Sequence, residues 1–186
     1  MKRFLLKALL SLVAIMSWQL GNAQDFSGER GYVDFGNLTG IYGEPTIQIN
    51  LGKTMLNFVS AAAQNEEPEV AELFKNLKSV RVLVYNIVGS TNDALNTVDR
   101  VTNDMRNEGW ESIVSVNKEK EKVRIYARMT ADIIDGLVVM AVDEDGIDDD
   151  KDAGPQAVFI NVIGQIDPAQ VGRLTSSLDI DVDVTP

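Results

Sequence analysis

The amino-acid sequence predicts a single α+β domain, built on a mostly antiparallel sheet of five or six strands with helices mainly on one face. Three segments in the first two thirds of the chain carry apolar residues at helical spacing. Short alternating or continuously apolar segments stand between and after them, and the later ones follow one another as hairpins do. No internal repeat or linker divides the chain, so one core is expected.

Residues 1–23 have the pattern of a signal peptide. Lys2 and Arg3 make a basic start, Ala8–Trp18 is apolar, and small residues precede Ala23. The apolar segment is short for a membrane span and no basic stop-transfer cluster follows it. We therefore expect cleavage after Ala23 and a periplasmic or secreted protein with no stable membrane anchor.

Three further regions follow the leader. Residues 24–44 are a Gly-rich lead-in, whose interleaved aromatic side chains favour docking onto the domain over a mobile segment or a ligand surface. Residues 45–178 are the expected α+β domain. Residues 179–186 form an acidic tail in which Asp alternates with apolar residues, as in a protected edge strand or a frayed end.

The first half of the domain alternates strand and helix signals. Thr46–Leu51 alternates as a half-buried strand does, and Lys53–Ala63 has helical spacing. A second helix is expected to begin at Pro68, with an apolar face that ends at Leu77. Val80–Val88 is almost continuously apolar, which is typical of a central strand.

The second half begins with a third helix, which is expected to start near Ser90 and to stop at Gly109. Ser112–Asn117 and Val123–Met129 flank a Lys/Glu turn and predict a hairpin. Leu137–Val142 predicts the next strand.

The sharpest local signal lies near the C-terminus. Ala157–Ile163 alternates on both faces, as a buried strand does, and Gly164 marks a turn. Asp167 suits the N-cap of a final helix. Val171 and Leu174 would turn the apolar side of that helix onto the sheet.

The residue types that are missing exclude several chemistries. The chain has no His and no Cys, so imidazole bases, thiol nucleophiles, disulfides and thiolate metal sites are ruled out. No nucleotide-binding or serine-hydrolase motif occurs. Three of the 17 basic residues and none of the 28 acidic residues lie in the leader, so the mature chain would carry a net charge of −14. Such a chain is repelled by nucleic acid and anionic lipid. Because the usual catalytic residues and motifs are missing, the sequence predicts a protein that is not an enzyme.

Residues 143–152 hold seven acids in ten positions. Oxygen ligands on a flexible loop suit Ca²⁺, but the spacing of an EF-hand fails: counting from Asp148, Ala153 stands where Gly is needed and Phe159 where Glu is needed. A solvated loop is the favoured interpretation, and a calcium site is the alternative. The candidate calcium ligands are Asp143, Asp145, Asp148, Asp150 and Asp152.

Three stretches of the chain carry a family resemblance: TIQINLGKTML, VRVLVYNIV and FINVIGQIDPAQVGRL. Through them Pro45–Leu174 resembles the family called domain of unknown function 4252. The resemblance implies a small bacterial protein targeted to the cell envelope, with an α+β body and no catalytic residues to carry over.

The leading functional hypothesis is a non-catalytic binding or interaction protein of the envelope, with an envelope protein as its expected partner. One alternative is a protein that responds to divalent cations through the acidic segment. The other is a small carboxylate-dependent hydrolase, which needs two carboxylates in one cleft. Trp110 could stack on a sugar, but its place after a helix-ending Gly favours a core position.

Overall fold

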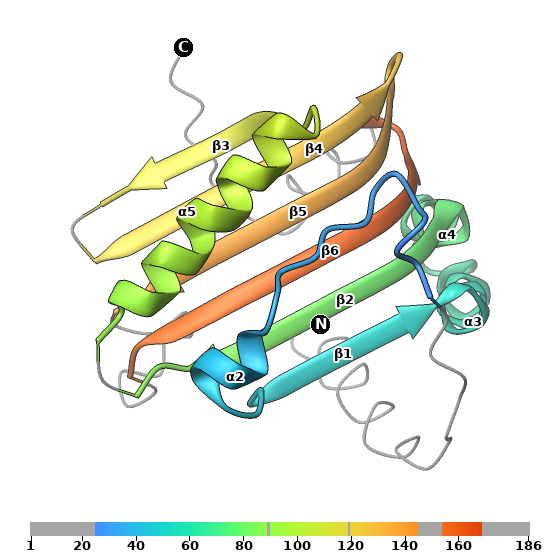
Figure 1. Ribbon diagram of the computed structural model, residues 1–186. Coiled ribbons are helices and arrows are strands. Elements are labelled where there is room, and N and C mark those ends of the chain that lie inside the picture. Colours follow the sequence, from blue (N-terminus) through green and yellow to red (C-terminus); the bar gives the residue numbers. More distant parts are fainter. Residues whose placement is uncertain (1–24, 89, 119, 145–153, 169–186) are drawn as a thin grey trace.

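The computed structural model describes residues 25–88, 90–118, 120–144 and 154–168. Its centre is a six-stranded sheet in the order β1-β2-β6-β5-β4-β3 (Figure 1). Every neighbouring pair of strands is antiparallel. The α+β class and the antiparallel sheet are therefore confirmed. The expected leader, the acidic tail and the body of the final helix lie outside the described residues.

Most elements begin and end within a few residues of the predicted bounds. The helix predicted over Lys53–Ala63 has those bounds. Gly109, with its positive φ of 82°, follows the helix predicted to start near Ser90, as a helix stop signal should. In chain order the elements are α2 (Leu38–Tyr42), β1 (Ile47–Gly52), α3 (Lys53–Ala63), α4 (Pro68–Asn76), β2 (Leu77–Asn86), α5 (Asn92–Asn107), β3 (Glu111–Asn117), β4 (Glu121–Thr130), β5 (Ile133–Asp143) and β6 (Gln156–Ile166). Among the described helices, none is long and apolar enough to cross a membrane.

Two local predictions were wrong, and both concern residues at the contact between β2 and β6. Leu77 begins β2 instead of ending a helix, and β6 continues through Gly164 to Ile166 without a turn. Leu77 pairs with Gly164 across the two strands. A Cβ on Gly164 would lie 2.6 Å from the Leu77 Cα, so the glycine allows the close approach of β2 instead of a reversal of the chain.

The face of the sheet that carries Tyr85 and Phe159 is called the front face here. The described residues before β1 (25–44, the lead-in) and helix α5 lie across it (Figure 1). Val33, Phe35 and Leu38 of the lead-in belong to the same buried cluster as these two rings. The ring centroids of Phe35 and Phe159 are 5.4 Å apart. The lead-in therefore docks onto the domain, as its aromatic side chains predict.

Among the described elements, α3 and α4 cover one end of the opposite face, which is called the back face here. Leu56 of α3, which is fully buried, belongs to a second cluster with Leu77 and Ile166. Partly buried Leu51 and Val80, on the back of β1 and β2, pack against this cluster. The two clusters thus lie on opposite sides of the sheet. The prediction that the helices lie mainly on one face is wrong, because α2 and α5 pack on the front and α3 and α4 on the back.

Candidate functional site: a groove beside the lead-in

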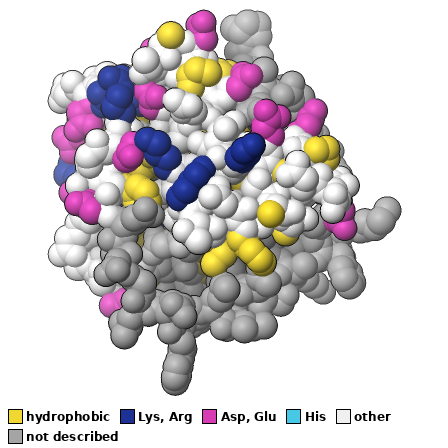
Figure 2. Space-filling view, turned by 90° about the vertical axis from the view of Figure 1, so that its right-hand side faces the viewer, with side chains coloured by type: hydrophobic (Ala, Val, Ile, Leu, Met, Phe, Trp, Pro, Cys, Tyr) yellow, Lys and Arg dark blue, Asp and Glu magenta, His cyan; other side chains and the backbone are white. Residues whose placement is uncertain are grey.

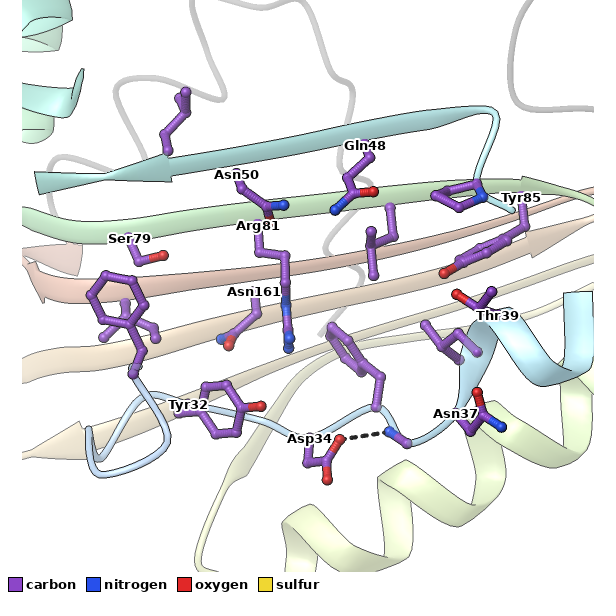
Figure 3. A pocket seen from close by; sticks show the side chains of 18 of the residues that line it. Tyr32, Asp34, Asn37, Thr39, Gln48, Asn50, Ser79, Arg81, Tyr85 and Asn161 are labelled. Atoms are coloured by element: carbon purple, nitrogen blue, oxygen red, sulfur yellow. Dashed lines mark hydrogen bonds between the residues drawn. The ribbon is translucent and has the colours of Figure 1, made fainter. Parts of the chain in front are cut away.

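The structure holds an open groove of about 950 Å³ on the front face. The lead-in forms one wall, and the front surfaces of β1, β2 and β6 form the floor (Figure 3). Polar and aromatic side chains dominate the lining. Those labelled in Figure 3 are Tyr32, Asp34, Asn37, Thr39, Gln48, Asn50, Ser79, Arg81, Tyr85 and Asn161.

Strand periodicity decides which side chains form the floor. Gln48 and Asn50 lie on the front of β1, while Ile49 between them faces the back. Asn50 is paired with Arg81 across β1 and β2, which brings an amide and a guanidinium side by side. β1 is an edge strand, so both amides are exposed and available to a ligand.

A buried amide holds the wall in place. Asn161 on β6 is 1% exposed, and its Oδ1 accepts a hydrogen bond of 3.1 Å from the Val33 backbone N–H. Its Nδ2 donates to the carbonyl oxygens of Gly31 at 2.8 Å and Leu137 at 3.4 Å. A Cβ on Gly31 would lie 2.2 Å from the Asp135 carbonyl oxygen, so the lead-in touches the sheet backbone there.

Arg81 fixes the same segment from the floor. Its Nη2 donates to the Val33 carbonyl oxygen at 2.6 Å. The guanidinium carbon lies 5.2 Å from the centroid of the Tyr32 ring and 4.9 Å from that of Phe35, within cation–π range. Within the described part of the chain, no carboxylate lies at ion-pair distance from Arg81. The carbonyl dipole and the two rings stabilise the guanidinium, which lines the groove.

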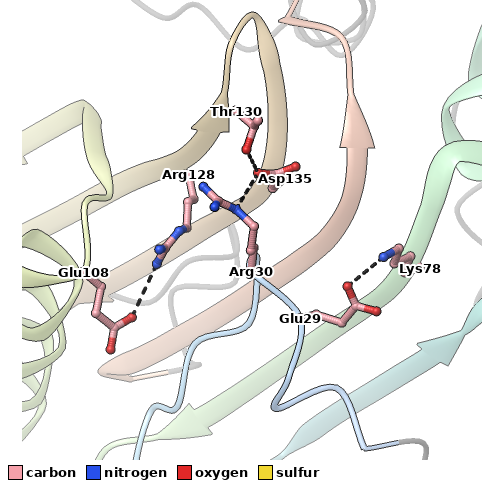
Figure 4. A network of polar contacts seen from close by, with 7 residues as sticks. All are labelled: Glu29, Arg30, Lys78, Glu108, Arg128, Thr130 and Asp135. Carbon is pink, nitrogen blue, oxygen red and sulfur yellow. Dashed lines mark hydrogen bonds and ion pairs between the residues drawn. The ribbon is translucent and has the colours of Figure 1, made fainter.

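Ion pairs join the start of the lead-in to one end of the sheet (Figure 4). Lys78 pairs with Glu29 at 2.7 Å, and Arg30 with Asp135 at 3.2 Å. Asp135 also accepts a hydrogen bond of 2.5 Å from the Thr130 hydroxyl. Seen from this end, basic side chains gather at the centre of the surface with acidic ones around them (Figure 2). Exposed pairs of this kind contribute only about 0–1 kcal/mol each, so Asn161 is the stronger anchor.

Three carboxylates line the groove: Asp25, Asp34 and Glu44. The Oδ1 of Asp25 accepts a hydrogen bond of 2.9 Å from the Ser27 N–H, which lowers the pKa of Asp25 below its usual value. Asp34 accepts one of 2.8 Å from the Gly36 N–H. Both are turn-forming bonds to the backbone two residues on. A general acid needs a raised pKa, so Asp25 is shifted in the direction opposite to the one a hydrolase requires.

The structure describes one of the five predicted calcium ligands. Asp143, half-buried, ends β5 opposite Gln156 of β6. Asp145, Asp148, Asp150 and Asp152 lie outside the described residues. Among the residues that the structure places, no group of three or more acidic side chains could hold a metal ion. The calcium site stays a prediction.

Trp110 is a core residue, as its position predicts. Its side chain is 4% exposed and lies in the front-face cluster with Met105 of α5. Because its ring is enclosed, it is not a platform for a sugar.

The family model described as Domain of unknown function (DUF4252) matches residues 42–174 of the chain. The chain belongs to this family. No curated protein and no solved structure matches the chain. The match includes every strand of the sheet, so the groove floor belongs to the DUF4252 segment, while the wall made by residues 25–41 precedes it.

Two polar residues within apolar strand segments are a signal for the groove that could have been noticed in the sequence. Arg81 interrupts the apolar stretch VRVLVYNIV, and Asn161 interrupts FINVIG. Both lie on the front face of central strands of this DUF4252 domain, where buried polar groups are rare unless they have hydrogen-bond partners. Those partners come from residues about 50 to 130 positions earlier, which no local pattern specifies.

Proposed function

We propose that this DUF4252 protein is an exported, non-catalytic binding protein of the cell envelope that holds a ligand in the groove beside the lead-in. The observation that carries the proposal is the groove itself. Its volume of about 950 Å³ falls within the range of roughly 300–1,000 Å³ that is usual for ligand pockets. The leader pattern and the absence of Cys support an exported protein that is stabilised by packing alone.

The lining favours a ligand with several neutral hydrogen-bonding groups. The amides of Gln48 and Asn50 and the hydroxyl of Ser79 offer both donors and acceptors along the floor. Arg81 adds a cation in the centre, and the carboxylates on the wall offset it. A strongly charged ligand of either sign would meet a like charge in this groove, so an uncharged polar molecule fits better.

The groove is preorganised for binding. Its wall is anchored by Asn161 and Arg81 and by Arg100 of α5, whose Nη2 donates to the Phe35 carbonyl oxygen at 2.6 Å. A ligand therefore need not order the lead-in when it binds, which lowers the entropy loss of association. The hydrogen bonds also hold the floor and the wall at a fixed separation.

The proposal is tested with a variant that fills the groove. Asn50→Trp places a large ring over the floor, and Asn57→Trp on the exposed surface of α3 is the matched control. Each full-length chain is immobilised and exposed to an envelope extract at physiological salt, and the retained small molecules are identified by mass spectrometry. We expect a molecule that is retained by the wild type and Asn57→Trp and lost with Asn50→Trp. Equal retention by all three chains, or none by the wild type, would refute a groove ligand.

A further inference from the structure

β1 leaves one edge of the sheet open. Within the described residues its only strand neighbour is β2, and no other described segment forms a hydrogen bond with the outer backbone groups of Ile47–Gly52. In an antiparallel pair, every second residue of an edge strand directs its N–H and C=O away from the neighbouring strand. β1 therefore presents donors and acceptors in the repeat that another extended strand can match.

The two edges of the sheet differ in how well they are protected. β3, at the other edge, begins with the charged Glu111 and has a bulge between Ser112 and Val114, and both features hinder the addition of a strand. β1 has no charged residue, no proline and no shift in its register with β2. A regular edge without such protection favours pairing with a further strand.

The side chains of β1 specify what kind of strand fits. The front carries the amides of Gln48 and Asn50, and the back carries aliphatic side chains, from Ile47, Ile49 and Leu51. A strand that continues both surfaces needs the same alternation of uncharged polar and aliphatic residues. β1 of a second copy has this alternation, and its lack of charge allows two copies of an acidic chain to meet here.

The helices that flank β1 leave room for a second copy. α2 and α3 lie at opposite ends of β1 (Figure 1), and Leu38 places α2 on the front face while Leu56 places α3 on the back. In an antiparallel pair of β1 strands, α2 of one copy comes beside α3 of the other on the opposite face, so the helices do not collide. Three of the six large apolar side chains that are exposed in the described chain lie on these elements: Ile41 at 47%, Ile47 at 44% and Phe58 at 54%.

We propose that the protein forms a twofold symmetric dimer in which β1 pairs antiparallel with β1 of a second copy, with Ile49 on the axis. Ile49 then lies opposite its own copy, and Ile47 lies opposite Leu51 on the back. On the front, Gln48 lies opposite Asn50, so each face joins like with like. The two six-stranded sheets become one, and the floors of the two grooves meet across the axis. The dimer does not depend on a ligand in the groove.

Charge changes at Gln48 and Asn50 test this pairing, since both side chains are exposed and the core stays intact. Gln48→Asp with Asn50→Asp brings like charges together across the axis, whereas Gln48→Lys with Asn50→Asp brings opposite charges together. The mass of each full-length chain is measured by light scattering over a range of protein concentrations. We expect twice the chain mass of 20.4 kDa for the wild type and the opposite-charge variant, and a dimer dissociation constant at least about tenfold higher for the like-charge variant.

A second test does not depend on charge, because the chain contains no cysteine of its own. Ile49→Cys should form a disulfide between chains in a glutathione redox buffer, since the axis brings the two thiols together. Val114→Cys is the matched control: Val114 lies in the same aliphatic row of the back face, on the other edge strand. We expect the covalent dimer to form at least about tenfold faster in Ile49→Cys.

Three outcomes would overturn the proposal. A wild type that is monomeric at every concentration would show that the edge stays open. Equal dissociation constants for the two charge variants would show that Gln48 and Asn50 do not face each other across an axis. Equal rates of disulfide formation in Ile49→Cys and Val114→Cys would show that β1 is not the interface.

Discussion

Replacing Asn161 by Leu should weaken the attachment of the lead-in to the sheet. Leu keeps the branched shape of Asn and is somewhat larger, but it neither donates nor accepts hydrogen bonds. The change removes the bonds to the Val33 N–H at 3.1 Å and the Gly31 carbonyl oxygen at 2.8 Å. A typical intramolecular hydrogen bond contributes about 1 kcal/mol, and a buried group left without a partner costs about 1–3 kcal/mol. We expect the free energy of unfolding to fall by about 2–4 kcal/mol.

The assay is equilibrium unfolding in urea together with hydrogen exchange of the Val33 amide. A loss of this size lowers the melting temperature by roughly 4–16 °C in a chain of this length. Asn50→Leu is the matched control: it lies in the same groove, but its exposed amide anchors nothing in the lead-in, and we expect a change within about 0.5 kcal/mol. If Asn161→Leu unfolds like the wild type, or if exchange at Val33 is unchanged, the amide is not the anchor.

Two further outcomes follow from the front-face core. The Tyr126 hydroxyl is buried without a hydrogen-bond partner within the described structure, so Tyr126→Phe should raise the free energy of unfolding by about 1 kcal/mol, measured in urea; a loss of stability would reveal a partner for the hydroxyl. Burial raises the pKa of Tyr42 above its usual value, which means that the neutral phenol contributes stability below the unfolded pKa and that this stability disappears as the pH rises through the folded pKa. Ultraviolet titration should show a late-ionising tyrosine that Tyr42→Phe removes, and an unchanged titration curve would contradict this.

Much of the fold could be read from short stretches of sequence. Lys53–Ala63 appears as the predicted helix because its apolar spacing is local and unambiguous. The hairpin of β3 and β4 follows from alternation around a short turn. Gly164 was assigned wrongly because a glycine that ends a strand and one that permits close strand packing look the same in the sequence. The neighbouring strand decides between them.

The groove depends on contacts that no local pattern contains. The lead-in was expected to dock through its aromatic residues, and it does so through Phe35. Its path across the sheet, however, is set by Asn161, which bonds to Val33 from 128 residues away. The amides of the floor gain a common surface only when β1 takes the edge beside β2.

The sequence by itself determined the α+β class, helices α3, α4 and α5, most strands, and the absence of chemistry that needs His or Cys. Periodicity, capping residues and composition act over a few positions, so they survive as readable signals. Only the tertiary structure decided the strand order, the place of the lead-in and the groove between it and Asn50. These features arise where residues distant in the chain meet, and the free energy that selects them comes from burial and hydrogen bonds that exist only in the folded domain.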